Sequence, residues 1–144
     1  MSYIVKMRKT LLLIICIVAY VEAGAQYFMS GQEPASTKWE QINSGNFQLI
    51  FPENFSEKAQ HVANILEYSY DRVSSSMEHK PRKISVIIHN KSVTSNGFVA
   101  PAPHRMELFS VPPQDNHPMP WLEHLCIHEL RHWVQIDKLN QGIT

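Results

Sequence analysis

Hydrophobic and polar positions along the chain first alternate and then recur with a helical period. Two alternating stretches, 38–42 and 47–51, flank the polar residues 43–46 and end at Pro52, which predicts a β-hairpin. Asn54 or Ser56 could then cap a helix with a side-chain oxygen. The apolar residues that follow recur every three or four positions and predict one buried helical stripe, made of Ala59, Val62, Ala63, Leu66, Tyr70 and Val73.

The second half of the chain predicts three more strands and a second helix. The segment 83–89 is short and rich in β-branched residues, as inner strands are. Strand pieces are expected at 98–100 and 105–111, and the prolines between them place the first at a sheet edge or bulge. A helical period then covers 121–139. The order strand, strand, helix, strand, strand, strand, helix predicts an α+β fold.

The first 25 residues have the pattern of an export signal rather than of a folded element. Lys6, Arg8 and Lys9 precede an uncharged apolar run at 11–20, and Ala23-Gly24-Ala25 matches the small-x-small cleavage pattern. The run is about half the roughly 20 residues that a spanning helix needs, so an uncleaved membrane anchor is the weaker interpretation. We expect a signal peptide at 1–25, a linker at 26–37 and a domain at 38–144. The mature protein would be periplasmic, envelope-associated or secreted, and free of the membrane after cleavage.

Charge and cysteine content narrow the functional classes. Basic and acidic residues balance at 13 each, and removing the signal leaves a small negative excess, so nothing indicates nucleic-acid binding. Only Cys126 remains in the mature chain. It lies on the predicted second helix, where a buried free thiol is the favoured interpretation.

His128-Glu129-Leu130-Arg131-His132, on that predicted helix, matches the pattern H-E-x-x-H. Residues four apart lie about 40° apart around a helix, so both imidazoles can reach one Zn²⁺. Glu129 would face a groove and take a proton from water that attacks a carbonyl. His124 lies about 12 Å along the axis from His132, too far to share the ion, and is expected at the rim.

With apolar residues on both sides, the motif resembles the active-site helix of the zincin metallopeptidases. The gluzincin branch is the more similar, because Gln135 and Lys138 stand where metzincins have Gly and His. The resemblance implies the N-terminal (upper) zincin subdomain, a mixed sheet with an amphipathic helix and an active-site helix. It also implies a zinc cofactor and a peptide or protein substrate. The chain is further similar to peptidase-like modules that precede TolB-like β-propellers in exported bacterial proteins.

In the resembled family an extended substrate pairs with an edge strand above the cleft. Here that strand would be Gly97, Phe98, Val99 and Ala100, or else 105–109. These four residues are the predicted substrate-binding positions.

One departure from the gluzincin pattern is serious. The branch takes its third zinc ligand from a later glutamate, but no Glu follows Glu129, and Asp137 would point away from the histidines. We therefore expect a truncated fragment, whose missing C-terminal subdomain would pack on the cleft.

Two alternatives to the enzyme stay open. The first is a non-catalytic binding module of a larger exported envelope protein, favoured by the missing ligand and disfavoured by Glu129. The second is a small helical metal-binding or structural protein with a coincidental motif, disfavoured by the strand-rich region 83–111.

Other polar residues near the motif are expected to be structural or solvent-exposed. Glu107, Asp115 and His117 are interpreted as solvated loop residues, His104 and Arg105 as surface, and His89 as a strand-edge histidine. A polar strip beside the two histidines is predicted from His124, Arg131, Gln135 and Lys138.

Overall fold

The computed structural model describes residues 11–12, 33–114 and 119–141. The chain divides into two units, 1–30 and 31–144, and the fold below is that of the second. The predicted export signal apart from residues 11–12, most of the predicted linker, and Asp115 and His117 lie outside the described residues. Among the residues described, no helix has the length and apolar character needed to cross a bilayer.

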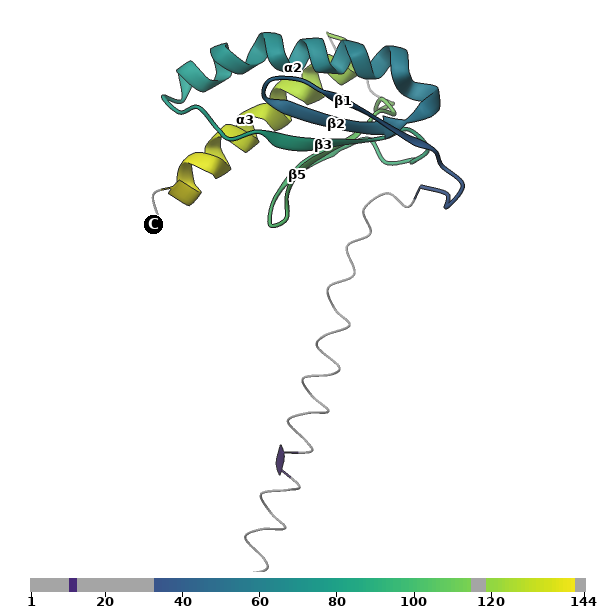
Figure 1. Cartoon of the computed structure of the whole chain (residues 1–144), viewed down its shortest axis with the longest axis horizontal. Helices are drawn as coiled ribbons and strands as arrows, with labels where there is room; N and C mark the ends of the chain where they lie inside the picture. The colour runs from purple at the N-terminus through teal and green to yellow at the C-terminus, as the bar shows by residue number, and fades with distance from the viewer. Residues whose placement is uncertain (1–10, 13–32, 115–118, 142–144) are drawn as a thin grey trace, which may run out of the picture. The chain divides into compact units, whose positions relative to one another are not determined.

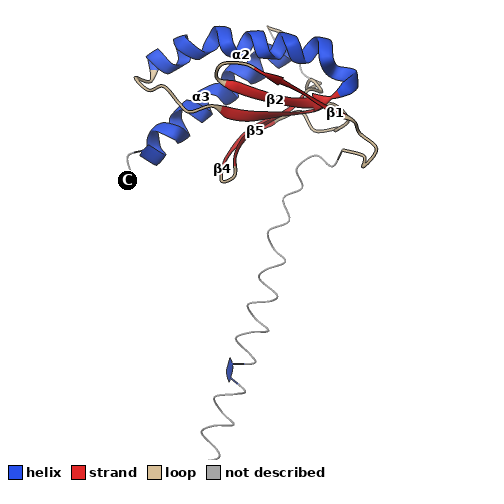
Figure 2. Cartoon of the chain, viewed as in Figure 1, coloured by secondary structure: helices blue, strands red, loops and turns tan. Residues whose placement is uncertain are grey.

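The described part of unit 31–144 is an α+β fold, as predicted, with two long helices against one five-stranded mixed sheet (Figures 1 and 2). Its elements follow the predicted order, and the strands are β1 (Trp39–Asn43), β2 (Phe47–Pro52), β3 (Ile84–His89), β4 (Gly97–Pro101) and β5 (His104–Phe109). The helical elements are the 3₁₀ turn η1 (Glu53–Phe55), α2 (Ser56–Ser76) and α3 (Trp121–Gln141).

The strand order β1-β2-β3-β5-β4 places the hairpin strand β1 at one edge of the sheet and β4 at the other. The inner strands β2, β3 and β5 run parallel, with Leu49 opposite Val86 and Val86 opposite Met106. Both edge strands are antiparallel to their neighbours. The predicted edge position of the strand before Pro101 is therefore confirmed.

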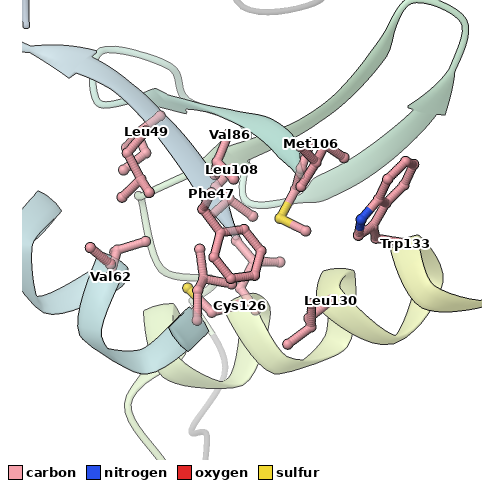
Figure 3. Close-up of a cluster of buried hydrophobic side chains, with 14 of the residues drawn as sticks. Phe47, Leu49, Val62, Val86, Met106, Leu108, Cys126, Leu130 and Trp133 are labelled. Atoms are coloured by element: carbon pink, nitrogen blue, oxygen red, sulfur yellow. The ribbon is translucent and has the colours of Figure 1, made fainter. Parts of the chain in front are cut away.

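Both helices cover the same face of the sheet and share one hydrophobic core with it (Figure 3). Alternate residues of the inner strands point at the helices, so Leu49, Val86 and Met106 are fully buried. Cys126 is fully buried on α3, and this burial raises the pKa of its thiol to about 12. The prediction of a buried free thiol is confirmed.

The start of α2 differs from the prediction, because neither Asn54 nor Ser56 caps it with a side chain. The turn η1 leads directly into the helix, so Ser56 is already its first residue. The Ser56 hydroxyl lies 2.8 Å from the carbonyl oxygen of Glu53, and the Asn54 side chain accepts a hydrogen bond from Asn90. Both polar side chains therefore join neighbouring segments instead of the helix end.

Glu67 of α2 holds the turn between β1 and β2. Its carboxylate accepts hydrogen bonds from the Ser44 hydroxyl (2.5 Å), the Asn46 amide N–H (2.8 Å) and the Asn46 side chain (2.7 Å). Burial alone would raise the pKa of Glu67, but the hydrogen bonds from Asn46 and Ser44 outweigh it and lower the pKa.

Replacing Glu67 with Gln should lower the free energy of unfolding by about 1–2 kcal/mol at neutral pH, because these charge-assisted bonds weaken. A lowered folded-state pKa stabilises the fold above the unfolded pKa, and this contribution disappears as pH falls through the folded pKa. The difference between wild type and variant should therefore shrink in acid, as urea unfolding at pH 7 and pH 3 would show. The exposed Asp71→Asn change is the control, and an equal loss there would contradict the role given to Glu67.

Candidate functional site

A cavity of about 450 Å³ is lined by the exposed side of α3 and by the edge strand β4. Helix α3 buries Leu125, Leu130 and Trp133 in the core, so its polar side is turned toward this space. The cavity is lined from the strand side by Asn96, Gly97, Phe98 and Val99, and from α3 by Trp121, His124, Leu125, His128, Glu129, His132 and Ile136.

The two motif histidines converge at the cavity wall. The Nε2 atoms of His128 and His132 are 3.0 Å apart, and their rings meet edge to face. Two imidazoles bound to one tetrahedral zinc at 2.0–2.1 Å would have nitrogens about 3.3 Å apart. The pair is thus already spaced to share one ion.

The electrostatics around His128 favour its neutral form. Burial lowers the pKa of His128, and the neighbouring His132, His124 and Arg131 lower it further. A neutral imidazole keeps the lone pair that a metal requires.

Glu129 lies between the histidines and the strand, more deeply than expected. Glu129 lines the cavity, as expected, but it is only 3% exposed. The expectation that its carboxylate faces an open groove is therefore wrong. Burial raises the pKa of Glu129 to about 7. Its Oε2 atom is buried and has no hydrogen-bond partner within the described ranges. Burying an oxygen without a hydrogen-bond partner costs free energy, and such groups are typical of functional sites.

Gly97 of β4 explains how Glu129 becomes so closely covered. A Cβ atom at this position would lie 2.8 Å from Cγ and 2.9 Å from Oε1 of Glu129, and 2.9 Å from Leu125. Only glycine lets the strand approach α3 this closely. The substrate-strand prediction placed Gly97 at the cleft, and the structure adds its direct contact with the carboxylate.

The Gly97→Ala variant should displace Glu129 and lower kcat/KM for peptide hydrolysis by about 10- to 100-fold, because catalytic groups tolerate little misplacement. Overpacking should also cost about 1–3 kcal/mol in urea unfolding. Gly45→Ala is a matched control, since its Cβ would meet Glu67 at an ordinary 3.7 Å. If Gly97→Ala left both kcat/KM and the free energy of unfolding at wild-type values, this close approach would carry no function.

The residues present fit part of a zinc site. Two imidazoles provide the nitrogen donors, an unpartnered carboxylate lies beside them, and a cavity lies in front of them. Across the described ranges no group of three His, Cys, Asp or Glu side chains is placed to hold a metal. The two imidazoles could therefore serve as two of the three protein ligands that a catalytic zinc requires, with the carboxylate as a base.

Asp137, the acidic residue after the motif, is committed elsewhere. It is fully buried and accepts hydrogen bonds from Arg82 Nε at 2.9 Å and from the Arg82 backbone N–H at 3.2 Å. His79 Nε2 lies 2.9 Å from the same carboxylate. The hydrogen bonds lower the pKa of Asp137 despite the opposing effect of burial. As expected from helix geometry, Asp137 points away from the histidines and fastens α3 to the segment before β3.

Glu107, His89 and Arg105 form a second buried polar group, on the sheet face that the helices leave uncovered. His89 Nε2 lies 3.0 Å from Oε2 of Glu107, and Arg105 Nε donates to Oε1 at 2.5 Å. Burial would raise the pKa of Glu107, but the bonds from His89 and Arg105 lower it. Glu107 is 3% exposed, so its interpretation as a solvated loop residue is wrong.

The predictions for the neighbouring residues also need correction. His89 ends the strand β3, as expected, but it is buried there, and Arg105 is half-buried instead of on the surface. His104 is exposed, as predicted. Glu33, in the segment interpreted as a linker, accepts hydrogen bonds from the backbone N–H groups of Asn90 and Lys91 and packs beside His89.

The predicted polar strip on α3 is divided among different surroundings. His124 lines the cavity, whereas Arg131 lies in a separate groove against α2, and Lys138 donates to the carbonyl oxygen of Met77. All four members are exposed on α3, as the predicted strip requires, but only His124 among them lines the cavity.

Four cavity residues were missed from the sequence, namely Asn96, Trp121, Leu125 and Ile136. Trp121 and Ile136 lie on the same helical face as His128, at spacings that extend the motif in both directions, so the period alone could have found them. Trp121 is held in place by a 3.3 Å hydrogen bond from its Nε1–H to the carbonyl oxygen of Phe109. Asn96 carried no signal, because it lies in the loop before β4. Of the four predicted strand residues, Ala100 does not line the cavity.

Comparisons of the chain with protein-family models, with curated proteins and with solved structures found no match. The class of this protein is therefore defined by its geometry alone. It is an α+β domain whose second long helix presents two histidines and a buried carboxylate to a cleft beside an edge strand.

Proposed function

We propose that this chain carries the metal-binding helix of a zincin-like peptidase domain that hydrolyses peptide bonds. One observation carries the proposal: the Nε2 atoms of His128 and His132 meet at a cavity wall beside the unpartnered carboxylate of Glu129. The third protein ligand is expected from outside the described residues. The substrate class is peptide or protein, and the predicted export signal makes an envelope or extracellular location the natural proposal.

Each residue has a separate task in this proposal. His128 and His132 hold the ion through their neutral imidazoles. When bound, zinc polarises the substrate carbonyl and makes water acidic enough to attack near neutral pH. Glu129 accepts the proton of the attacking water and later delivers it to the leaving amine, a cycle suited to a carboxyl with a pKa near 7.

The strand β4 would set the direction in which an extended substrate lies across the cavity. One edge of β4 pairs with β5, and its other edge is unpaired within the described sheet and borders the cavity. An extended peptide could add to this edge through main-chain hydrogen bonds. Trp121 and Leu125 at one end of the cleft, and Ile136 at the other, favour apolar substrate side chains.

A non-catalytic binding module is the second candidate. It is favoured by one observation, that two histidines without a third ligand are found within the described residues. Such a module would bind peptides along β4 without cleaving them.

Hydrolysis of a mixed set of quenched fluorescent peptides by the purified, untagged full-length protein, with zinc in excess, separates the two candidates. The enzyme proposal predicts cleavage that a chelator abolishes and that zinc restores. Peptide binding without cleavage, at any zinc concentration, would support the module and end the enzyme proposal.

A further inference from the structure

A second groove of about 280 Å³ runs between α2 and α3 and shares no residue with the cleft described above. Arg72 lines it from α2 and Arg131 from α3, with Val73 and Ile127 forming an apolar floor. Tyr68, also on α2, stands at its border and is 87% exposed. Arg131 is one of the two variable positions inside the H-E-x-x-H motif, and the proposed peptidase chemistry gives it no role.

The two arginines of this groove differ from the other arginines of the described chain. Arg82 pairs with Asp137, and Arg105 pairs with Glu107. Arg72 and Arg131 are exposed and have neither a hydrogen bond nor an ion pair with any described residue. The neighbouring acids are occupied, since Asp71 lies 3.7 Å from Lys80 and Glu123 lies 3.3 Å from His61. The groove is therefore left with a local positive charge, although the mature chain is slightly acidic.

The composition of the groove indicates which anion it suits. Arginine presents a planar fork that binds a carboxylate through two parallel hydrogen bonds. The two forks come from different helices, and the floor between them is apolar, so the space suits a polypeptide segment better than a single small anion. Tyr and Arg are also the residues most enriched in the energetic centres of protein interfaces.

We propose that this groove docks an acidic segment of another protein. Glutamate or aspartate side chains of that segment pair with Arg72 and Arg131, an apolar side chain between them packs on Ile127, and Tyr68 covers the segment from the side. The site is independent of zinc and of Glu129, so it holds whether or not the cleft is catalytic.

The test is binding of a dye-labelled peptide, Gly-Glu-Glu-Leu-Glu-Glu-Gly, to the full chain, followed by fluorescence polarisation at low and moderate salt. The double variant Arg72→Gln/Arg131→Gln should bind at least about tenfold more weakly than wild type. Arg72→Lys/Arg131→Lys should fall between the two, because lysine keeps the charge and loses the fork. A peptide with Gln in place of Glu should not bind.

The matched control is Lys58→Gln/Lys91→Gln, which removes the same charge from exposed positions that line other parts of the surface. It should stay within about twofold of wild type, because distant exposed charges are screened by salt. Thermal unfolding of each variant confirms that all are folded.

Three results would overturn the proposal. The first is an equal loss of peptide affinity in Arg72→Gln/Arg131→Gln and in the control Lys58→Gln/Lys91→Gln, which would show a dependence on net charge alone. The second is competition by inorganic phosphate or by phosphatidylglycerol vesicles at the affinity of the peptide, which would make the groove a general anion site. The third is the absence of peptide binding by the folded wild-type chain.

Discussion

Replacing Glu129 with Gln is expected to lower kcat for peptide hydrolysis by about 10²- to 10⁴-fold while leaving zinc binding unchanged. Glutamine has nearly the same size, but its amide cannot accept the proton of the attacking water. In the proposed arrangement His128 and His132 hold the ion, and Glu129 acts as the base without ligating it. The effect should therefore appear in kcat, with metal content preserved.

The fold should survive this substitution. Glu129 is 3% exposed, and its Oε2 has no hydrogen-bond partner in the described chain, so an uncharged side chain of equal size replaces it without breaking a contact. Glu123→Gln is the control, because Glu123 lies on the same helix but pairs with His61 away from the motif. Retention of wild-type kcat by Glu129→Gln, or an equal loss in Glu123→Gln, would contradict the role given to Glu129.

The positions of the strands and helices could be predicted because each local pattern agrees with the final packing. The stripe from Ala59 to Val73 is the buried face of α2, and the β-branched run before His89 is the central strand β3. The five residues of the motif likewise lie on one helix, where the spacing of the side chains follows from helical geometry alone. Such elements can be predicted from the sequence because the local conformational preference agrees with the tertiary packing.

The polar contacts could not be predicted, because they join segments that are distant in sequence. Glu107 appeared to be a solvated residue, yet parallel pairing of β3 with β5 brings it to His89. Gly97 carried no sign that it would contact Glu129, since that contact depends on how the edge strand crosses α3. Nothing in the sequence indicated that Arg131 also borders a groove against α2, because the position of α2 beside α3 is a tertiary property.

Loss of the two histidines is the second large effect expected. Replacing His128 and His132 together with Gln should weaken zinc binding by at least about 100-fold, because changes in the residues around metal ligands alone cost about 10- to 100-fold. Both side chains are exposed to the cavity and neither fills the core, so the variant should fold as the wild type does. Far-UV circular dichroism and thermal unfolding provide that check.

The control variant also removes two histidines, but from positions away from the cavity. His61 and His104 are exposed and lie away from the cavity lining, with His61 beside Glu123 and His104 beside Arg82. The variant His61→Gln/His104→Gln should bind zinc as the wild type does. It therefore separates a specific site from adventitious binding to surface imidazoles.

Calorimetric titration of zinc into the purified, untagged, metal-free chain tests the central claim most directly. The account predicts one ion per wild-type chain, retained in the control variant and lost from His128→Gln/His132→Gln. Equal zinc binding by all three proteins, or none by the folded wild type, would contradict it.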